Sequence, residues 1–516
     1  MRYGFVIDQR KCIGCHACTV ACKEENRVPL GAFRTWVKYV ERGTFPNTRR
    51  YFSVLRCNHC DAAPCVTICP TVALYRRDDG IVDFDGARCI GCKSCMQACP
   101  YDALYIDPQT MTAAKCNYCA HRVEVGLEPA CVIVCPERAI IAGDLDDPST
   151  QIATIVSREP VQVRKAEQGT RPKVFYLGAD AASLTPELQA PSERYMWAQR
   201  PAEEVDLVRM VAAAQETEPG RSAAGLSRPV YDVPHAVRPW GWKVSAYLWT
   251  KSIAAGALLV AAFAGSDSWG GLFNGIAPAL SLLFLAITTG LLVFDLKRPE
   301  RFAFILLKPN WRSWLVWGAW ILIAFGAAGA LWLVGGMTGR SDVLHLALIP
   351  SVLLALATAG YSAFLFGQAE GRDFWQSPLV LPHLIIAAVV AGAATLSIAA
   401  AIAPLQSTEA DPSVTLWPLL FLSLVAHGFL VGLEVFNRHA VHDATLAARL
   451  IRKGPYRARF WVGVALGGVA VPMALMILGA ASDSTALSTL GALFALGGLW
   501  VWEDLWVRAG QSVPLS

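Results

Sequence analysis

The chain of 516 residues is long enough for at least two domains, and its hydrophobic content of 54 % with a mean hydropathy of +0.39 excludes an ordinary soluble protein. Its net charge of only +4 gives no indication of nucleic-acid binding. The two ends differ: all 16 cysteines lie between Cys12 and Cys135, whereas long uncharged apolar runs begin at about residue 244. We therefore expect a cysteine-rich soluble domain followed by a membrane domain.

The cysteines form four groups of four along the first part of the chain. Two groups have the spacing C-x2-C-x2-C-x3-C, the other two also end in C-x3-C, and three of the four groups end in Cys-Pro. This run is typical of bacterial ferredoxins, in which thiolates hold a [4Fe–4S] cluster and the fourth cysteine ligates the cluster of the partner group. The sequence therefore predicts four such clusters. In chain order the groups are Cys12, Cys15, Cys18 and Cys22; Cys57, Cys60, Cys65 and Cys69; Cys89, Cys92, Cys95 and Cys99; and Cys116, Cys119, Cys131 and Cys135.

Two other uses of so many cysteines fit the sequence less well. Structural zinc prefers two separated C-x2-C pairs over three cysteines at two-residue gaps. Disulfide bonds need an oxidising compartment, and the first residues, MRYGFVIDQRKC, contain neither the apolar core of a signal peptide nor a twin-arginine motif. We therefore expect that this domain is not exported and that its cysteines bind clusters.

Between the groups, strand-like stretches such as GIVDFD and ALYI alternate with short helical ones, as in ferredoxin modules inserted into one another. Residues 1–190 resemble the four-cluster electron-transfer subunits of the molybdopterin oxidoreductases, such as formate dehydrogenase, dimethyl sulfoxide reductase and polysulfide reductase. The resemblance implies an α+β, tandem ferredoxin-like domain in which the first group pairs with the fourth and the second with the third. The implied ligand sets are Cys12, Cys15, Cys18 and Cys135; Cys22, Cys116, Cys119 and Cys131; Cys57, Cys60, Cys65 and Cys99; and Cys69, Cys89, Cys92 and Cys95.

Residues 191–239 are rich in Pro, Arg and Ala, and we expect them to form a surface linker with little structure of its own. Residues 240–516 contain eight apolar segments, most of them longer than the roughly 20 residues that a helix needs to cross a bilayer. This part is therefore expected to be an all-α bundle of eight transmembrane helices. The segments lie at about 244–264, 270–294, 313–337, 342–368, 377–403, 413–436, 458–480 and 484–502.

The loops between these segments differ sharply in positive charge. Loops on the side of the N-terminal domain hold twelve Lys and Arg residues, whereas those on the far side hold one, Arg340. By the positive-inside rule, the cysteine domain is expected on the cytoplasmic side of the inner membrane. The twelve are Lys297, Arg298, Arg301, Lys308, Arg312, Arg372, Arg438, Arg449, Arg452, Lys453, Arg457 and Arg459.

A few polar side chains lie inside the predicted helices, and at 1.5 Å per residue all fall in the half nearest the cysteine domain. Ionisable groups are costly in lipid, so their default interpretation is functional. The alternatives are that Lys251 extends to the interface, that Asp295 binds loop arginines, and that the histidines only fill space. The set is Lys251, Asp295, Tyr361, His383, His427 and Glu434.

The stretch DLKRPERF (295–302) after the second segment, together with GYSAFLFGQAEGRDFW (360–375) at the end of the fourth, resembles the NrfD-like membrane subunit of polysulfide reductase. This resemblance spans about residues 235–510 and implies eight helices, no haem and a quinone pocket on the iron–sulfur side. Asp295 and Tyr361 would face menaquinone or ubiquinone, beside Trp242, Tyr247, Lys251 and Arg298. Apart from the resemblance, the ionisable residues in the cytoplasmic half of the helices lead us to expect that His383 and Glu434 belong to the quinone site and its proton supply. Polysulfide reductases of this kind work outside the cytoplasm, opposite to the side that the loop charges indicate here.

The sequence contains no molybdenum-binding domain, P-loop or dinucleotide fingerprint, so we expect the substrate chemistry on a partner. The favoured function is an electron-transfer and quinone-reactive subunit that connects a Mo/W-bisPGD catalytic subunit, through four [4Fe–4S] clusters, with the membrane quinone pool. Formate oxidation is the favoured chemistry of that partner, followed by sulfite oxidation.

Three alternatives remain at this point. One is a subunit that oxidises quinol for a reductase of polysulfide, thiosulfate or dimethyl sulfoxide. Another is a redox-gated, ion-translocating membrane protein. The third is a haem-carrying subunit, which would need His383 and His427 to face each other across the bundle as axial ligands.

Overall fold

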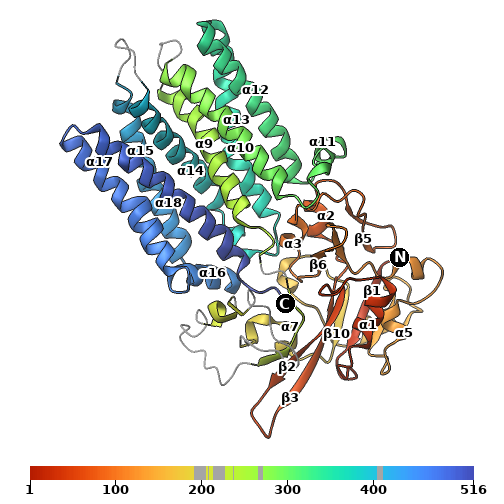
Figure 1. Cartoon of the computed structure of the whole chain (residues 1–516). Helices are drawn as coiled ribbons and strands as arrows, with labels where there is room; N and C mark the ends of the chain where they lie inside the picture. The colour runs from red at the N-terminus through yellow and green to blue at the C-terminus, as the bar shows by residue number, and fades with distance from the viewer. Residues whose placement is uncertain (191–204, 207, 213–226, 236–237, 265–270, 404–410) are drawn as a thin grey trace.

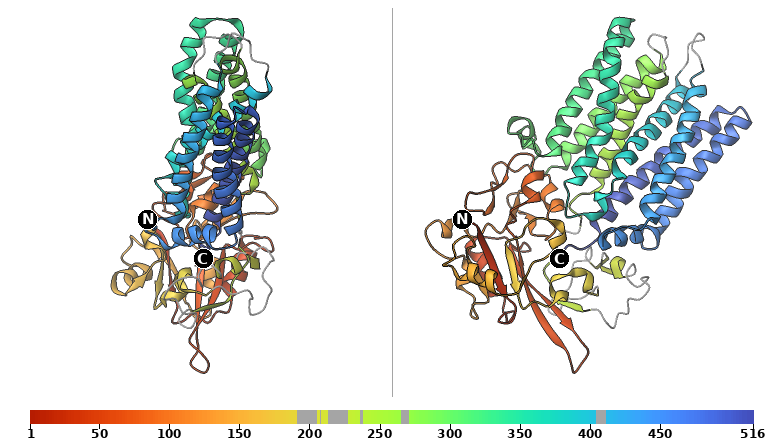
Figure 2. Two further views of the ribbon diagram at one scale, coloured as in Figure 1. Left: turned by 90° about the vertical axis from the view of Figure 1, so that its left-hand side faces the viewer. Right: turned by 180° about the vertical axis from the view of Figure 1, so that it is seen from behind.

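The computed structural model has two parts, an α/β part and a long helical bundle that extends from one side of it (Figure 1). The structure describes residues 1–190, 205–206, 208–212, 227–235, 238–264, 271–403 and 411–516. Both chain termini lie at the α/β part, the N-terminus within it and the C-terminus at its junction with the bundle (Figures 1 and 2).

The α/β part is built on small sheets. The largest has the strand order β8-β1-β10-β9, in which β1 is parallel to β10 and antiparallel to β8. Antiparallel pairs β4–β5 and β6–β7 form two short hairpins, and β2 pairs with β3 in a longer one. The strands are β1 (Tyr3–Asp8), β2 (Thr35–Arg42), β3 (Arg49–Arg56), β4 (Leu74–Arg76), β5 (Val82–Phe84), β6 (Leu104–Ile106), β7 (Ala113–Lys115), β8 (Ile140–Asp144), β9 (Val161–Gln162), β10 (Val174–Leu177) and β11 (Arg228–Tyr231).

Short helices follow the cysteine loops, and the residue after the last cysteine decides where two of them end. Cys69 and Cys99 adopt extended backbone angles at the ends of α2 and α3, because a proline follows each and disfavours the helical conformation of the preceding residue. Lys23 follows Cys22 instead, and α1 continues to Glu25. The helices are α1 (Ala17–Glu25), α2 (Pro64–Ile68), α3 (Ser94–Ala98), α4 (Ala120–Val123), α5 (Ala130–Ile133), α6 (Gln151–Arg158) and α7 (Ala181–Leu184), with short turns η1 (Ala166–Gln168) and η2 (Pro186–Leu188).

The segment expected to be an unstructured linker, residues 191–239, lies mostly outside the described residues. Its described end departs from the expectation, because residues 228–231 form β11 and pair antiparallel with β2. His235 then lies between Asp102 and Asp232, at 2.7 and 3.3 Å from their carboxylate oxygens. Although burial opposes its charge, these two carboxylates raise the pKa of His235 to about 10, so the described end of this segment is held to the cluster domain by a half-buried cation.

Within the described residues, the bundle contains eight helices that are long and apolar enough to cross a membrane, which confirms the α+β domain followed by an all-α multi-pass bundle. Seven match the predicted segments closely. The eighth runs from Thr485 to Gln511, beyond the predicted end at 502, and the charged pair that ended the apolar run, Glu503 and Asp504, is buried inside it. The spans are Trp242–Ala264 (α9), Leu272–Asp295 (η4 and α10), Trp314–Thr338 (α12), Ser341–Gly367 (α13), Val380–Ile402 (α14), Ser413–Phe436 (α15), Arg459–Ala481 (η7 and α17) and Thr485–Gln511 (α18).

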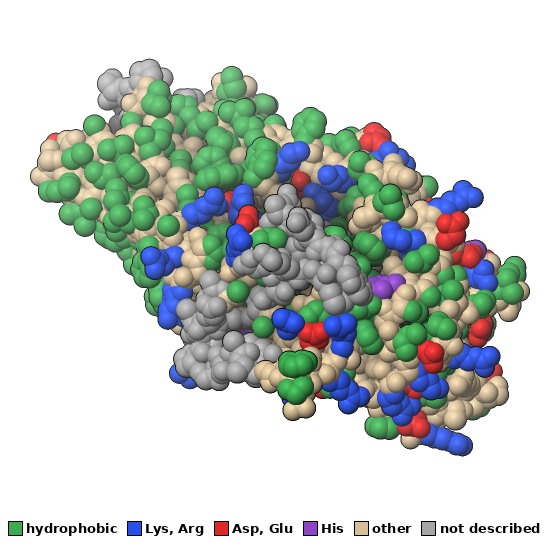
Figure 3. Space-filling model, turned by 60° about the horizontal axis from the view of Figure 1, so that its bottom comes forward, with side chains coloured by type: hydrophobic (Ala, Val, Ile, Leu, Met, Phe, Trp, Pro, Cys, Tyr) green, Lys and Arg blue, Asp and Glu red, His purple; other side chains and the backbone are tan. Residues whose placement is uncertain are grey.

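Four shorter helical elements occupy the loops on the side of the α/β part: η5 (Pro299–Arg301), α11 (Phe304–Leu307), η6 (Asp373–Gln376) and α16 (His442–Arg452). This is also the end that carries the twelve positive loop residues. Figure 3 shows the same pattern on the surface, with hydrophobic side chains over the bundle and Lys and Arg side chains gathered where the bundle meets the α/β part. The loop charges therefore lie on the same side of the bundle as the cysteine domain.

Candidate functional site

The cysteines meet across the sequence groups. One cavity is lined by Cys12, Cys15, Cys18 and Cys135, and another by Cys69, Cys89, Cys92 and Cys95. In the remaining sets, Cys22 lies close enough to Cys116, Cys119 and Cys131 to interact with them electrostatically, as Cys65 does with Cys57, Cys60 and Cys99. These four gatherings are the sets that the crossed pairing requires.

The spacing of the sulfur atoms indicates whether they can bind a single metal ion or a cluster. Among the described residues, no three His, Cys, Asp or Glu side chains are close enough to bind one metal ion. A zinc ion needs sulfur ligands about 2.3 Å away, so its cysteines converge on one point. These cysteines instead surround a space, as the ligands of a four-iron cube do. The residues fit [4Fe–4S] clusters and do not fit mononuclear zinc.

The four sets lie in a row. Cys18 of the first set lies near Cys131 of the second, Cys116 lies near Cys57 of the third, and Cys95 lies near Cys65, which joins the third set to the fourth. At one end of the row Cys15 is exposed, and at the other end Cys92 lies against the membrane domain. The row therefore connects the outer surface of the α/β part with the bundle.

A buried arginine lies at the second set. Arg56 is 1 % exposed, its Nη1 donates to Cys131 Sγ at 3.1 Å, and its guanidinium lies 4.4 Å from the centre of the Phe5 ring. Although burial opposes its charge, the surrounding cysteines raise the pKa of Arg56, so it stays a cation. A fixed positive charge favours added electrons, and it therefore raises the reduction potential of a cluster held here.

The membrane domain holds the fourth set through the loop of the DLKRPERF stretch. Lys297 and Arg298 donate their backbone amides to Gly91 and Ile90, and Arg301 Nη1 donates to the Cys89 carbonyl at 3.1 Å. Gly91 has a φ of +70°, and a side chain there would meet Lys297. The DLKRPERF loop and the cysteine loop at Gly91, which are far apart in sequence, are thus hydrogen-bonded to each other at the fourth ligand set.

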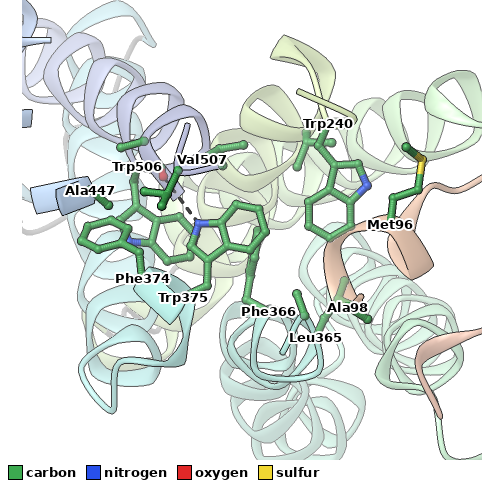
Figure 4. Close-up of a cluster of buried hydrophobic side chains, with 14 of the residues drawn as sticks. Met96, Ala98, Trp240, Leu365, Phe366, Phe374, Trp375, Ala447, Trp506 and Val507 are labelled. Carbon is green, nitrogen blue, oxygen red and sulfur yellow. Dashed lines mark hydrogen bonds between the residues drawn. The ribbon is translucent and has the colours of Figure 1, made fainter. Parts of the chain in front are cut away.

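A second loop and a group of aromatic side chains complete this junction. Asn310 Nδ2 donates to the Cys69 carbonyl at 2.8 Å. Figure 4 shows Trp240 beside Met96 of α3, with Phe366, Trp375 and Trp506 packed on the other side of it, and the Trp240 and Trp375 rings stack 5.5 Å apart. Trp240 Nε1 also donates to the Cys92 carbonyl at 3.1 Å. The fourth set is therefore fixed against the bundle on several sides.

Beside Cys92 the bundle contains a cavity of about 420 Å³. Its walls are mostly aliphatic side chains of α10 and α12, and its polar lining includes Tyr247, Thr289, Asp295 and Tyr361. Phe302 and Ile323 also line it, and they are 47 % and 49 % exposed. An apolar pocket with a few convergent polar groups and an opening toward lipid suits a flat, polar head group on an apolar tail.

The structure brings three predicted residues, Tyr247, Asp295 and Tyr361, together in this cavity. Asp295 Oδ2 accepts from Lys93 Nζ at 2.8 Å, and Lys93 directly follows Cys92. Lys251 lies behind the wall: it is fully buried, and its Nζ lies 5.0 Å from the centre of the Tyr361 ring. It therefore does not extend to the interface, which was the simple alternative for this lysine.

The other predicted residues are not at the cavity. Trp242 is 56 % exposed and does not line it, because the polypeptide places Trp240, two residues earlier, against Cys92 instead. Arg298 points to Glu300 at 3.3 Å. His383 and Glu434 are buried in the other half of the bundle. Trp242 and Arg298 therefore do not line this cavity.

Sequence reasoning missed three residues at the site. Lys93 is hidden in a cysteine loop, where a lysine is unremarkable, and Trp240 directly follows the expected linker. Glu503 lies inside α18, beyond the predicted end of that helix. The signal that could have identified Glu503 was its position directly after a long apolar run, because a carboxylate in that position can belong to the same helix.

The facing histidines do not fit a haem. The His383 and His427 rings lie 5.0 Å apart at 69°, and Trp502 stacks on His383 at 5.4 Å. A macrocycle bound between two axial ligands would have to separate these rings, and they contact each other directly. The donor set therefore disagrees with a haem between these two histidines.

Comparison with known proteins agrees with both parts of the chain. Residues 232–513, more than half of the chain, match the family described as polysulphide reductase, NrfD. Residues 48–145 match a 4Fe-4S dicluster domain, and residues 10–26 match a 4Fe-4S binding domain.

Curated relatives resemble a smaller share of the chain. A tetrathionate reductase subunit of Salmonella typhimurium is 48 % identical over 200 residues, which are 38 % of this chain and 80 % of that protein. A polysulfide reductase polypeptide of Wolinella succinogenes is 41 % identical over 179 residues, 34 % of this chain and 93 % of that protein. Protein NrfC of Escherichia coli is 43 % identical over 178 residues, 34 % of this chain and 80 % of that protein. The chain is thus a member of the polysulphide reductase NrfD family, and it fuses the membrane part of that family to a 4Fe-4S electron-transfer part.

Proposed function

We propose that this chain carries electrons through four [4Fe–4S] clusters between a catalytic partner and a quinone in the membrane. The observation that carries the proposal is the position of Cys92, which belongs to the last ligand set and also lines the 420 Å³ cavity. When bound, the clusters supply one-electron transfer. The cysteines of the four sets are the proposed ligands, in the crossed pairing given above.

The residues of the cavity have separate roles in this proposal. Its aliphatic walls exclude water and take the tail, which extends past Phe302 and Ile323 into lipid. Tyr247 and Tyr361 present hydroxyl groups to the quinone oxygens, and Asp295, held by Lys93, fixes the polar end beside the cluster loop. Quinone reduction consumes two protons, so hydroxyl and carboxyl groups near its oxygens serve as proton donors.

The catalytic partner is proposed to bind at the opposite end of the row. There Cys15 is exposed, and Ile13 and Ile133 beside its ligand set are 55 % and 56 % exposed. Apolar side chains around an exposed cofactor site favour burial by another protein. We propose a molybdopterin-containing subunit, with Mo/W-bisPGD, as this partner.

The substrate of that partner is proposed from the names of the relatives. Two of those reported above are named for tetrathionate and polysulfide, and a further relative from Salmonella typhi is a thiosulfate reductase electron-transfer subunit. None of these names concerns formate or sulfite, so the formate preference gains no support from them. We propose a sulfur compound as the substrate, with electrons flowing in either direction between it and quinone.

The test is the oxidation of reduced clusters by quinone. The purified complex is reduced with dithionite, freed of the excess and mixed with a short-chain menaquinone or ubiquinone analogue in a stopped-flow instrument. The visible absorbance of oxidised clusters should return as quinol forms. Clusters that stay reduced with both analogues would refute the quinone role.

The loop charges support placing the cluster domain in the cytoplasm, and reporter fusions test this. A fusion after Ser516 and one near residue 195 should both be active as cytoplasmic reporters, because eight spans return the chain to its starting side. A reporter inserted in the loop at 405–414 should score on the outer face. The opposite pattern would place the cluster domain outside.

A further inference from the structure

A second set of buried titratable side chains lies in the bundle, and none of them lines the 420 Å³ cavity. They come from α9, α14, α15 and α18, and none is more than 9 % exposed. Within the described spans, the buried titratable atoms without a hydrogen-bond partner all lie in this set, namely His383 Nε2, His427 Nδ1, Glu434 Oε1 and Glu503 Oε2. The set is Lys251, Glu503, His383, His427 and Glu434.

Lys251 connects this set with the cavity. Its Nζ donates to the Ala359 carbonyl at 2.8 Å and to Ser362 Oγ at 2.9 Å. Ser362 directly follows Tyr361 in the chain, and Lys251 Nζ lies 5.0 Å from the centre of the Tyr361 ring; Tyr361 and Tyr247 both line the cavity. The buried ammonium is thus hydrogen-bonded to a serine hydroxyl and lies next to the ring of a tyrosine that lines the pocket.

Glu503 lies on the other side of Lys251. Its Oε1 accepts from Ser252 Oγ at 3.5 Å, and its charge interacts with that of Lys251. Its Oε2 is buried without a partner. A carboxylate in this position is costly unless it is paired, hydrated or protonated, so it is suited to accept and release a proton.

The histidines continue the set from Glu503 across the bundle. His383 stacks on Trp502, the sequence neighbour of Glu503, and contacts the His427 ring. Each histidine has one buried ring nitrogen with no partner. Buried polar atoms of this kind usually bind ordered water, which can also pass protons between them.

Glu434 is the end of the set nearest the cluster domain. It lies two turns from His427 on the same helix, and its Oε2 accepts from Ser377 Oγ at 2.9 Å. Ser377 is part of the loop between α13 and α14, where Gln376 and Pro378 are exposed. This short loop separates Glu434 from water on that side.

We propose that Glu434, His427, His383, Glu503 and Lys251, with bound water between them, form a lateral proton route from the cluster side of the bundle to the pocket. The inference rests on the proposed quinone reaction. Two electrons arrive through the cluster held by Cys92, and for each proton the Tyr361 O–H bond breaks as a quinone O–H bond forms. Lys251, through Ser362, then returns a proton to Tyr361, and Glu503 returns one to Lys251. The histidines and Glu434 replace the proton of Glu503 with one taken from water at Glu434. When quinol is oxidised, every step runs in reverse.

The test uses the purified complex with Glu503→Gln, which keeps the shape of the side chain and removes its proton exchange. We expect the quinone-driven oxidation of dithionite-reduced clusters to slow about 100-fold, as general acid–base groups commonly contribute roughly 10²–10⁴-fold. The solvent deuterium isotope effect should rise, since proton delivery becomes limiting. The reduced-cluster EPR spectra and the affinity for a quinone-site inhibitor should match the wild type. Glu434→Gln should slow the reaction in the same way.

Ser397→Ala is the matched control, because Ser397 is a buried hydroxyl on α14 that donates within its own helix, to the Ala393 carbonyl. Wild-type rates in Glu503→Gln, with no change in isotope effect, would overturn the route and leave the Asp295 side as the proton source. The wild-type protein tests the proposed function separately: if its clusters are not oxidised by quinone at all, that function fails, whatever the variants do.

Discussion

Replacing Tyr361 with Phe or Asp295 with Asn is expected to stop electron transfer to quinone while all four clusters remain reducible. Among the described residues that line the cavity, Tyr361 offers the only hydroxyl of its helix, and Asp295 is the only carboxylate. Both changes keep the shape of the side chain. We expect quinone-driven cluster oxidation to slow by roughly 10²–10⁴-fold, the range typical of a lost proton donor or acceptor. Stopped-flow absorbance after dithionite reduction measures it.

Asp295 also pairs with Lys93, so its loss could act by loosening the two domains. Lys93→Met separates these explanations, since it removes the same ion pair and leaves the carboxylate in the cavity. A large effect of Asp295→Asn with a small effect of Lys93→Met assigns the role to the carboxylate itself. Tyr456→Phe is the control for a lost buried hydroxyl, because Tyr456 bonds Ser512 away from the cavity. Rates close to the wild type in Tyr361→Phe would contradict the proposed pocket.

The four cysteine groups and the eight spans could be predicted because each depends on local sequence. Cysteine spacing indicates four [4Fe–4S] clusters, and a long apolar run indicates a membrane helix. The crossed ligand sets came from the family resemblance, because their members, such as Cys12 and Cys135, are far apart in the sequence. The eighth helix shows where this reasoning stops. Its last turns contain Glu503 and Asp504, and these turns stay helical because both carboxylates have partners. Ser252 donates a hydrogen bond to Glu503, and Arg459 and Arg508 form ion pairs with Asp504.

The pocket was predictable only in part, because its members meet across helices. Tyr361 and Asp295 were identified through short motifs. Sequence alone singled out Trp242, whereas the structure places Trp240, two residues earlier, at the cavity. Gly318 illustrates the same limit. A side chain there would overlap the Tyr361 ring, so this glycine makes the space that Tyr361 occupies, but no local pattern marks it.

Cys22→Ser and Cys18→Ser are expected to remove different clusters, although both residues lie on α1 one turn apart. Cys22 lies with Cys116, Cys119 and Cys131, whereas Cys18 lines the cavity of the first set. Serine is a poor ligand for a soft iron–sulfur cube, so each variant should fall from about sixteen to about twelve iron atoms per chain. Iron and sulfide analysis with EPR of each reduced variant measures this.

The consequence for electron transfer distinguishes the two losses. Without the second cluster, the row is broken in its middle, so electrons from the partner should reach the first cluster only, and quinol should reach only the third and fourth. Without the first cluster, quinol should still reduce the remaining three, including the one beside Arg56, whose buried positive charge favours the added electron. If Cys22→Ser instead removed the cluster of Cys12, Cys15 and Cys18, the crossed ligand sets, and with them the order of the row, would be wrong.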